Sequence, residues 1–184
     1  MKKYIFLFIV IFLWIGVFYK SKIFSDNRLP LKVKIVKSSK KIRNIDNFYV
    51  KSKDRVIYID KLYFPNKKPL QHYLYGNLNF YDNFFIFINS YIELKKDMIV
   101  KFFIASDDGF RLKIDDKVVC EFKKDRPFKT TECKTALKKG KHKLFIKYFQ
   151  GYGLLGLVGT YSVDKRQYYI GQNSDYIKFY ETDK

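Results

Sequence analysis

The stretch that decides the fold is FFIASDDGFRLKIDD, which occupies residues 102–116. Apolar and basic residues alternate at 110–114, and this period of two predicts a half-buried strand. The residues before it, 99–105, are apolar enough to form another strand. Asp115 and Asp116 then predict a tight turn, because aspartate tolerates the left-handed conformation, and residues 118–122 return antiparallel. The stretch therefore predicts neighbouring antiparallel strands.

The rest of the chain carries the same strand signal. Its 184 residues include 19 Phe and 16 Tyr, whereas Ala occurs only at positions 105 and 136. Aromatic and β-branched residues favour strands, and a scarcity of alanine disfavours helices. Further strands are expected at 31–35, 56–59, 62–64, 77–87, 90–94, 143–149 and 157–163. No long apolar period of 3.6 residues follows the N-terminal segment, so the expected fold class is all-β.

A second motif lies downstream of the first. It consists of a leucine, a Gly-Lys-His turn, an apolar strand that ends in glycine, and a small-residue loop, at Leu137, 140–142, 146–151, Gly153 and Leu157. The two motifs in this order resemble the second half of a PA14 domain, over about residues 90–161. The resemblance implies an antiparallel β-sandwich that occurs in exported and surface proteins. In several members of the family this module binds carbohydrate.

Within the resemblance, Asp107 and Asp108 are the candidate ligand-binding residues. In the lectin branch of the family, such a pair is joined by a cis peptide and holds a Ca²⁺ that receives sugar hydroxyls, which suits an ion that prefers oxygen ligands. That branch also takes an Asn ligand from a later loop. Here the loop has no Asn or Asp, although Gln150 offers a carbonyl and Tyr152 offers a ring. A calcium site and an Asp-Asp-Gly tight turn both stay open, and the missing Asn favours the turn.

The N-terminus predicts a membrane anchor. Two lysines precede an uninterrupted apolar run, Tyr4 to Tyr19. As a helix this run covers about 24 Å, near the lower limit for spanning a bilayer. A cleaved signal peptide is the alternative, but no pair of small residues has the spacing that cleavage needs, and no Cys follows the run. We therefore expect an uncleaved signal anchor, a transmembrane helix over residues 1–22.

The expected domain order is the anchor at 1–22, a basic stalk at 23–44, a PA14-like sandwich at 45–163 and a Tyr-rich extension at 164–184. Basic residues after the anchor would by themselves favour a cytoplasmic domain, but long domains translocate largely regardless of charge. From the resemblance we expect a single-pass protein of the inner (cytoplasmic) membrane. Its domain would lie on the periplasmic or extracellular side.

The formal net charge is +19, from 37 basic and 18 acidic residues. Such a balance can indicate nucleic acid or an anionic membrane as partner. The lysines are spread along the whole chain, however, and aromatic residues that alternate with lysine are typical of strands with one buried face. We therefore expect no nucleic-acid partner.

Cys120 and Cys133 are too few for a four-ligand zinc site. In a domain outside the cytoplasm they are expected to form one disulfide across the basic loop 123–129. Two buried free thiols are the alternative.

Nothing in the sequence predicts catalysis. His142 falls where the PA14 family has a structural histidine, and adjacent Asp107 and Asp108 lack the separation across a cleft that glycoside hydrolysis needs. The glycines at 151, 153 and 156 match a dinucleotide-binding string without the helix it requires, so they are expected to serve close packing. We expect a non-catalytic envelope module that recognises carbohydrate, such as a cell-wall glycan, through the residues Asp107, Asp108, Gln150 and Tyr152. The alternative is a structural protein-interaction module that uses the tail 167–180.

Overall fold

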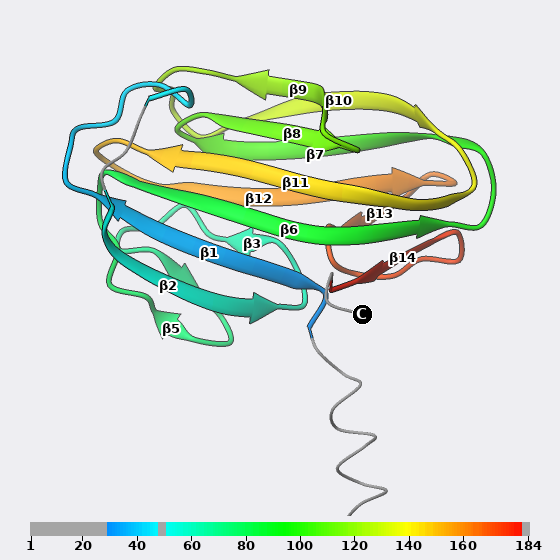
Figure 1. Cartoon of the computed structure of the whole chain (residues 1–184), viewed down its shortest axis with the longest axis horizontal. Helices are drawn as coiled ribbons and strands as arrows, with labels where there is room; N and C mark the ends of the chain where they lie inside the picture. The colour runs from blue at the N-terminus through cyan, green and yellow to red at the C-terminus, as the bar shows by residue number, and fades with distance from the viewer. Residues whose placement is uncertain (1–28, 48–50, 182–184) are drawn as a thin grey trace, which may run out of the picture.

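The computed structural model describes residues 29–47 and 51–181, and every regular element in this part is a β-strand (Figure 1). The all-β fold class expected from the sequence is confirmed. The expected anchor helix at 1–22 lies outside the described residues. Within them, no helix is long and apolar enough to cross a membrane.

The strands form two facing sheets and a short hairpin. The larger sheet contains β1 (Leu31–Ser38), β2 (Lys51–Ile59), β6 (Phe84–Leu94), β8 (Phe110–Ile114), β9 (Lys117–Phe122), β11 (Gly140–Gln150) and β14 (Ile177–Tyr180). The smaller sheet contains β3 (Tyr63–Phe64), β7 (Met98–Asp107), β10 (Lys129–Leu137), β12 (Gly156–Val163) and β13 (Arg166–Tyr169). The hairpin consists of β4 (Gln71–His72) and β5 (Gly76–Asn77).

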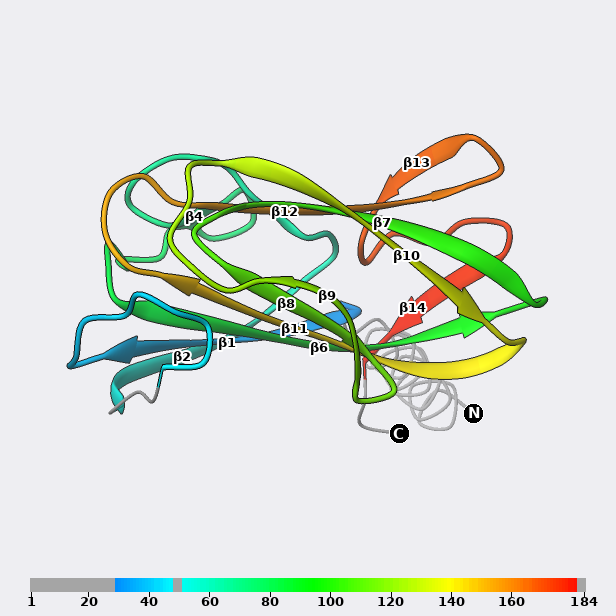
Figure 2. The ribbon, with the colours of Figure 1, turned by 90° about the horizontal axis from the view of Figure 1, so that it is seen from above.

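All strand pairs among these elements are antiparallel. The larger sheet runs β2-β1-β6-β11-β8-β9, with β14 also on β6, and the smaller one runs β10-β7-β12-β13, with β3 also on β12. The hairpin expected at 114–117 is present, since Asp115 and Asp116 both have positive φ angles of 49° and 62°. The two sheets lie face to face as an antiparallel sandwich (Figure 2), and most of its strand pairs join segments far apart in the chain, such as β6 with β11 and β7 with β12.

The core lies between the two sheets. Buried and partly exposed residues alternate along β6 and along β8, as expected for strands that bury one face. Aromatic side chains from both layers fill the space, among them the fully buried Phe84, Phe102, Phe110, Tyr148 and Tyr161. Burying such a side chain contributes about 1.5–3 kcal/mol to folding. The aromatic-rich composition therefore supplies the core.

A smaller apolar cluster covers the opposite face of the larger sheet. Phe85 on β6 and Phe149 on β11 lie opposite each other there, beneath Ile42 and Ile45. The covering segment, residues 39–46, is tied down because the Ile45 N–H donates to the Lys123 carbonyl oxygen at 2.8 Å. This segment is therefore part of the folded unit.

The expected domain boundaries at 45 and 163 do not match this unit. β1 lies between β2 and β6 in the larger sheet and buries Leu31, Val33 and Ile35 in the core, so residues 31–44 are not a stalk. At the other end of the chain, β13 pairs with β12 and β14 pairs with β6. Residues 164–181 therefore complete the sandwich and are not a separate extension. Alternation of apolar and polar residues predicts a strand but not the strand it pairs with. This is why both expected domain boundaries differ from those of the folded unit.

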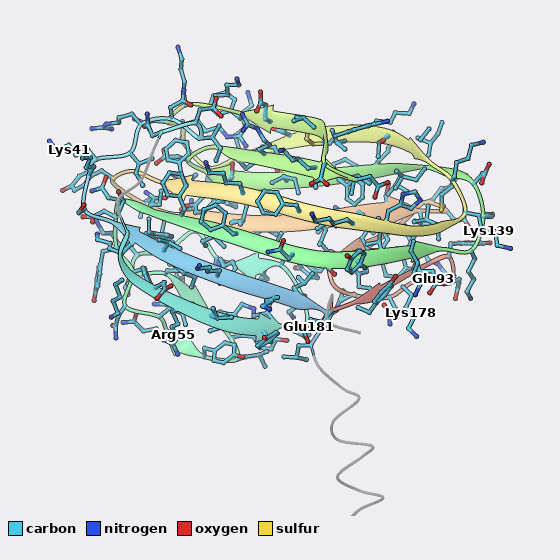
Figure 3. The ribbon with its side chains drawn as sticks, viewed as in Figure 1. Lys41, Arg55, Glu93, Lys139, Lys178 and Glu181 are labelled. Carbon is cyan, nitrogen blue, oxygen red and sulfur yellow. A yellow bond between two sulfur atoms is a disulfide. The ribbon has the colours of Figure 1, made fainter. Side chains whose placement is uncertain are left out.

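Basic side chains project from all around the sandwich. In Figure 3, Lys41 and Lys139 extend from its opposite ends, and Arg55 and Lys178 extend from two edges of the larger sheet. All four are exposed. These basic side chains of the described sandwich are thus dispersed over its surface.

A disulfide joins Cys120 to Cys133. Cys120 lies on β9 at the edge of the larger sheet, whereas Cys133 lies on β10 at the edge of the smaller sheet. The bond therefore links the two layers across the loop between β9 and β10.

Reducing this bond is expected to lower the free energy of unfolding by about 3 kcal/mol, because the opened loop gains conformational freedom mainly in the unfolded chain. The two cysteines are 13 residues apart. Urea unfolding of the full chain in detergent, with and without reductant, measures the change. Cys120→Ser should show the same loss without reductant. A wild-type midpoint that does not respond to reductant would contradict the expectation.

Candidate functional site

Three connections meet at the end of the sandwich toward which β11 points in Figure 1. They are the turn at 108–109, the loop at 123–128 and the loop at 151–155. The strand register brings them together, because Gly156 pairs with Asp107 and Lys129 pairs with Ser106. The candidate residues predicted from the sequence all lie at this end.

Glycine permits the close approach of these connections. A Cβ atom at position 109 would lie 2.5 Å from the Phe122 carbonyl oxygen, and one at position 151 would lie 2.7 Å from the Ile42 carbonyl oxygen. Such distances are far below van der Waals contact. Gly109 and Gly151 therefore let neighbouring backbones pack where any side chain would push them apart.

Asp108 holds the three connections together. Its side chain is only 5% exposed. The backbone N–H of Gly151 donates to its Oδ2 at 2.8 Å, and the backbone N–H of Arg126 donates to its Oδ1 at 3.1 Å. Burial raises the pKa of Asp108, and these two hydrogen bonds oppose the rise because they stabilise the ionised form. Both carboxylate oxygens are thus engaged by backbone groups.

Asp107 lies beside it, and the peptide bond between the two is cis. The Asp107 side chain is 8% exposed, and its carboxylate accepts the backbone N–H of Phe128. Burial raises the pKa of Asp107 to about 6, and the neighbouring charge of Asp108 adds to the rise. The cis pair that the resemblance implies is present, but as two buried carboxylates at the centre of a loop cluster.

Arg126 is a member of this site that the sequence analysis missed. Its guanidinium lies over the rings of Phe122 and Phe110, at 4.5 and 5.4 Å from their centroids, and it donates to the hydroxyl oxygens of Ser106 and Thr131, each at 2.8 Å. Its positive charge opposes the rise in the pKa of Asp107. No local pattern marks this arginine, since only the pairing of β10 with β7 brings it to the aspartates.

Gln150 is enclosed by the same end of the sandwich. The side chain is fully buried, and its Nε2 donates to the Leu154 carbonyl oxygen at 2.8 Å. The Tyr148 hydroxyl lies within hydrogen-bonding reach of the Gln150 Oε1, at 2.6 Å, and of the Asp107 carbonyl oxygen. Both ends of the amide are therefore engaged inside the protein, and Gln150 holds the loop at 151–155 in place.

The residues present do not fit the calcium ion that the lectin branch implies. Ca²⁺ takes six to eight oxygen ligands. Here both carboxylate oxygens of Asp108 already accept N–H groups, the Gln150 carbonyl is engaged, and a guanidinium lies beside Asp107. Among residues 29–47 and 51–181, no three His, Cys, Asp or Glu side chains are grouped to hold a metal. The observed donor set fits the tight-turn interpretation.

Exposed apolar side chains lie on the loops around this buried centre. Tyr152 is 73% exposed and Leu154 is 59% exposed, both on the loop at 151–155. Phe128 is also exposed, and its ring lies close to Gly156. The Lys68 ammonium lies 4.8 Å from the centroid of the Tyr152 ring. The sequence-predicted residues therefore separate into a buried group, Asp107, Asp108 and Gln150, and an exposed one, Tyr152.

The two histidines are held in structural positions. His72 is buried, its ring contacts that of Phe64, and burial lowers its pKa. The His142 Nδ1 lies 2.6 Å from an Asp115 carboxylate oxygen, and its Nε2 lies 2.8 Å from the Lys138 carbonyl oxygen. His142 thus supports the turn at 114–117, as the resemblance implies.

No protein-family model matches the chain, and no curated protein matches it. Solved structures do match its fold. The PA14 domain of the MpAFP antifreeze protein is 15% identical over 85% of this chain and 93% of that chain, with a TM-score of 0.64. A PA14 sugar-binding domain from an RTX adhesin is 14% identical over 79% of this chain and 93% of that chain, with a TM-score of 0.56.

A fungal adhesin has a similar structure. The Epithelial Adhesin 9 A domain from Candida glabrata, in complex with Galβ1-3GlcNAc, is 12% identical over 82% of this chain and 88% of that chain, with a TM-score of 0.54. At these identities the likeness concerns the fold. The architecture expected from the two sequence motifs is thereby confirmed.

Asp107→Asn is expected to stabilise the protein at neutral pH. The pKa of Asp107 in the folded protein, about 6, is above its ordinary value of 3.8. The protonated Asp107 therefore makes its full contribution to the free energy of unfolding below about pH 4. This contribution is lost as the pH rises through 6, which lowers the free energy of unfolding by up to about 3 kcal/mol. Thermal melting should place the variant several degrees above wild type at pH 7 and level with it at pH 4.

Calcium supplies the control for this variant. Neither millimolar Ca²⁺ nor a chelator should move the melting curve of the wild type or of Asp107→Asn. A rise in melting temperature with Ca²⁺ that occurs in wild type and disappears in Asp107→Asn would contradict the tight-turn account and favour a metal site.

Proposed function

Because the chain has a PA14-like fold, we propose that it is a non-catalytic module that recognises carbohydrate at the end of the sandwich around Asp107 and Asp108. Two structures of this fold, the sugar-binding domain from an RTX adhesin and the Candida glabrata adhesin domain with its bound disaccharide, support the ligand class. A glycan of the cell envelope is the proposed partner.

The observation that carries the proposal is the exposure of Tyr152 and Leu154 on a loop whose base is fixed. An exposed aromatic ring can take the apolar face of a sugar ring, and its hydroxyl can bond to sugar hydroxyls. The loop is held from below by the Gly151 N–H bond to Asp108 and by the Gln150 amide. A loop that is already ordered loses less conformational entropy when a ligand binds.

The residues expected to bind ligand then have two roles. Tyr152 contacts the glycan directly, with Phe128 and Lys68 beside it. Asp107, Asp108 and Gln150 position the loops, because their polar groups are engaged inside the protein. The Arg43 guanidinium and the Asp125 carboxylate, paired at 2.8 Å on the exposed side of the same end, offer a donor and an acceptor for hydroxyl groups.

We further propose that the module is exported and tethered by an uncleaved signal anchor at residues 1–22 to the inner membrane. The disulfide between Cys120 and Cys133 supports this location, since disulfides persist in oxidising compartments. The chain would thus be a single-pass envelope protein with the sandwich on the periplasmic or extracellular side.

A protein-interaction module is the second candidate function. The tail first considered as its surface is built into the two sheets as β13 and β14. A different surface favours the idea: Tyr73, Leu74 and Tyr75, between β4 and β5, are all exposed. Exposed apolar side chains that lie close together are typical of contact sites.

Tyr152→Ala is expected to weaken glycan binding by roughly tenfold, the loss typical of an exposed aromatic anchor. The full chain in detergent would be applied to a glycan array and to isolated cell-wall polysaccharide. Tyr73→Ala, which removes another exposed ring, from the patch between β4 and β5, should bind as wild type does. Binding that is lost in Tyr73→Ala but kept in Tyr152→Ala would move the site to that patch. No binding to either glycan source would favour the protein-interaction function.

Export is tested by fusing alkaline phosphatase after Lys184, because that enzyme folds to its active, disulfide-bonded form outside the cytoplasm. The fusion is expected to be active, and a cytoplasmic reporter fused at the same point is expected to be inactive. The opposite pair of results would place the sandwich in the cytoplasm.

A further inference from the structure

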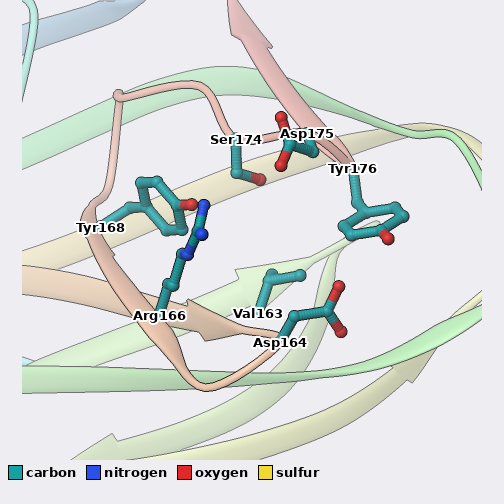
Figure 4. Close-up of a pocket in the computed structure, with 7 residues that line it drawn as sticks. All are labelled: Val163, Asp164, Arg166, Tyr168, Ser174, Asp175 and Tyr176. Atoms are coloured by element: carbon teal, nitrogen blue, oxygen red, sulfur yellow. The ribbon is translucent and has the colours of Figure 1, made fainter.

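A pocket opens at the other end of the sandwich, away from the Asp107–Asp108 turn. It lies between the hairpin of β12 and β13 and the connection from β13 to β14 (Figure 4). Its volume is about 220 Å³. Its polar and aromatic lining consists of Asp164, Arg166, Tyr168, Ser174, Asp175 and Tyr176.

One wall of the pocket is the hairpin. Its turn has two residues in the left-handed region, Asp164 and Lys165, with φ angles of 48° and 63°. The register pairs Val163 with Arg166 and Tyr161 with Tyr168, so all four side chains lie on the inner face of the smaller sheet. Tyr161 is fully buried, and its ring stacks on that of Tyr168 at 5.5 Å. The core therefore braces the aromatic part of this wall.

The other wall is the connection at 171–176, and hydrogen bonds fix it from three directions. The Tyr161 hydroxyl donates to the Gln172 carbonyl oxygen at 2.8 Å. The Ile177 N–H donates to the Ser174 Oγ at 3.2 Å, and the Lys95 N–H donates to the Tyr176 carbonyl oxygen at 3.0 Å. Both walls are thus anchored to the sheets, so the pocket is preformed.

Three charged side chains around the pocket are exposed: Asp164, Arg166 and Asp175. None of them makes an ion pair or a side-chain hydrogen bond with the rest of the described chain. In Figure 4, Arg166 extends beside the Tyr168 ring, while Ser174 and Asp175 lie across the opening from them. Acceptors and a donor therefore surround one cavity and keep their hydrogen-bonding capacity for a ligand.

From this arrangement we infer that the pocket is a second carbohydrate site, which binds one uncharged sugar residue. Two carboxylates disfavour an anionic ligand, and the guanidinium disfavours a polycation. Sugar hydroxyls both donate and accept hydrogen bonds, so they can satisfy both kinds of group. The Tyr168 and Tyr176 rings offer apolar surface for the face of a sugar ring.

The size of the pocket limits the ligand. The cavity has room for about seven water molecules at roughly 30 Å³ each, less than the usual pocket for a drug-sized ligand. The pocket therefore suits a single sugar residue, such as one at the end or at a branch of a glycan chain. The inference rests on the proposed function only for the ligand class and extends it to a separate site.

The two sites lie at opposite ends of β12. Gly156, at the start of this strand, pairs with Asp107, whereas Val163, at its end, lines the pocket. Eight residues of strand span about 25 Å. A module with a glycan site at each end can bridge two chains of a polysaccharide, and simultaneous engagement raises the overall affinity for a multivalent glycan.

The test follows the backbone amide signals of the full chain, labelled with ¹⁵N-tyrosine in detergent micelles, by NMR. N-acetylglucosamine, galactose and lactose are titrated in turn. The signals of Tyr168 and Tyr176 are expected to shift and saturate with at least one of these sugars. Arg166→Gln and Asp175→Asn should each weaken that binding at least tenfold. Unchanged signals from distant tyrosines would show that the variants stay folded.

The Tyr152→Ala variant distinguishes binding at the two sites. It should leave the sugar-dependent shifts of the Tyr168 and Tyr176 signals unchanged. No shift of either signal with any of the three sugars would overturn the inference, and so would a shift that Arg166→Gln and Asp175→Asn leave intact. A shift at Tyr152 alone would support the proposed function and overturn the second site. Shifts at Tyr168 and Tyr176 without one at Tyr152 would support the second site and count against the proposed one.

Discussion

The Asp108 carboxylate is the interaction on which one whole end of the sandwich depends. It accepts the backbone N–H groups of Arg126 and Gly151, which belong to loops that lie on either side of it. Hydrogen bonds to a charged acceptor each contribute about 1.5–3 kcal/mol, and a buried N–H without a partner costs a similar amount. Because these loops lead into β10 and β12, one side chain fixes where two strands of the smaller sheet begin.

Two adjacent buried carboxylates need a compensating positive charge, since isolated charges are expensive to bury. In this chain Arg126 supplies that charge, held in place by two aromatic rings and two hydroxyl groups. A guanidinium that belongs to the chain stays in the site whatever the ionic composition outside. Two of its nitrogen atoms already donate to the hydroxyl oxygens of Thr131 and Ser106, and it offers no open coordination position of the kind through which a bound metal receives sugar hydroxyls. Under the proposed function, ligand contact is therefore left to exposed side chains such as Tyr152.

Most of the strands could be predicted from the sequence because alternation of apolar and polar residues is a local signal, as in the segments around Phe110 and Leu144. Which strands pair with one another could be predicted far less well. The alternation at Leu31, Val33 and Ile35 predicts a strand. Only its pairing with β6, more than 50 residues away, makes it a strand of the core. Arg126 escaped notice for the same reason. The pocket beside Tyr168 could not be predicted either, since its lining comes from the hairpin of β12 and β13 and from the connection to β14, which no sequence motif relates to each other.

The places where the described chain enters and leaves the sandwich determine how a tether would be located relative to the two proposed sites. The Ser90 hydroxyl on β6 lies 2.8 Å from the Pro30 carbonyl oxygen and 3.2 Å from the Tyr180 carbonyl oxygen. β1 and β14 thus meet end to end along one side of β6, and the chain enters and leaves between the two ends of the sandwich. A tether that reaches the domain at Pro30 would hold it by this side. The Asp108 loops and the pocket beside Tyr168 would then both stay open to long glycan chains, because neither lies at the point of attachment.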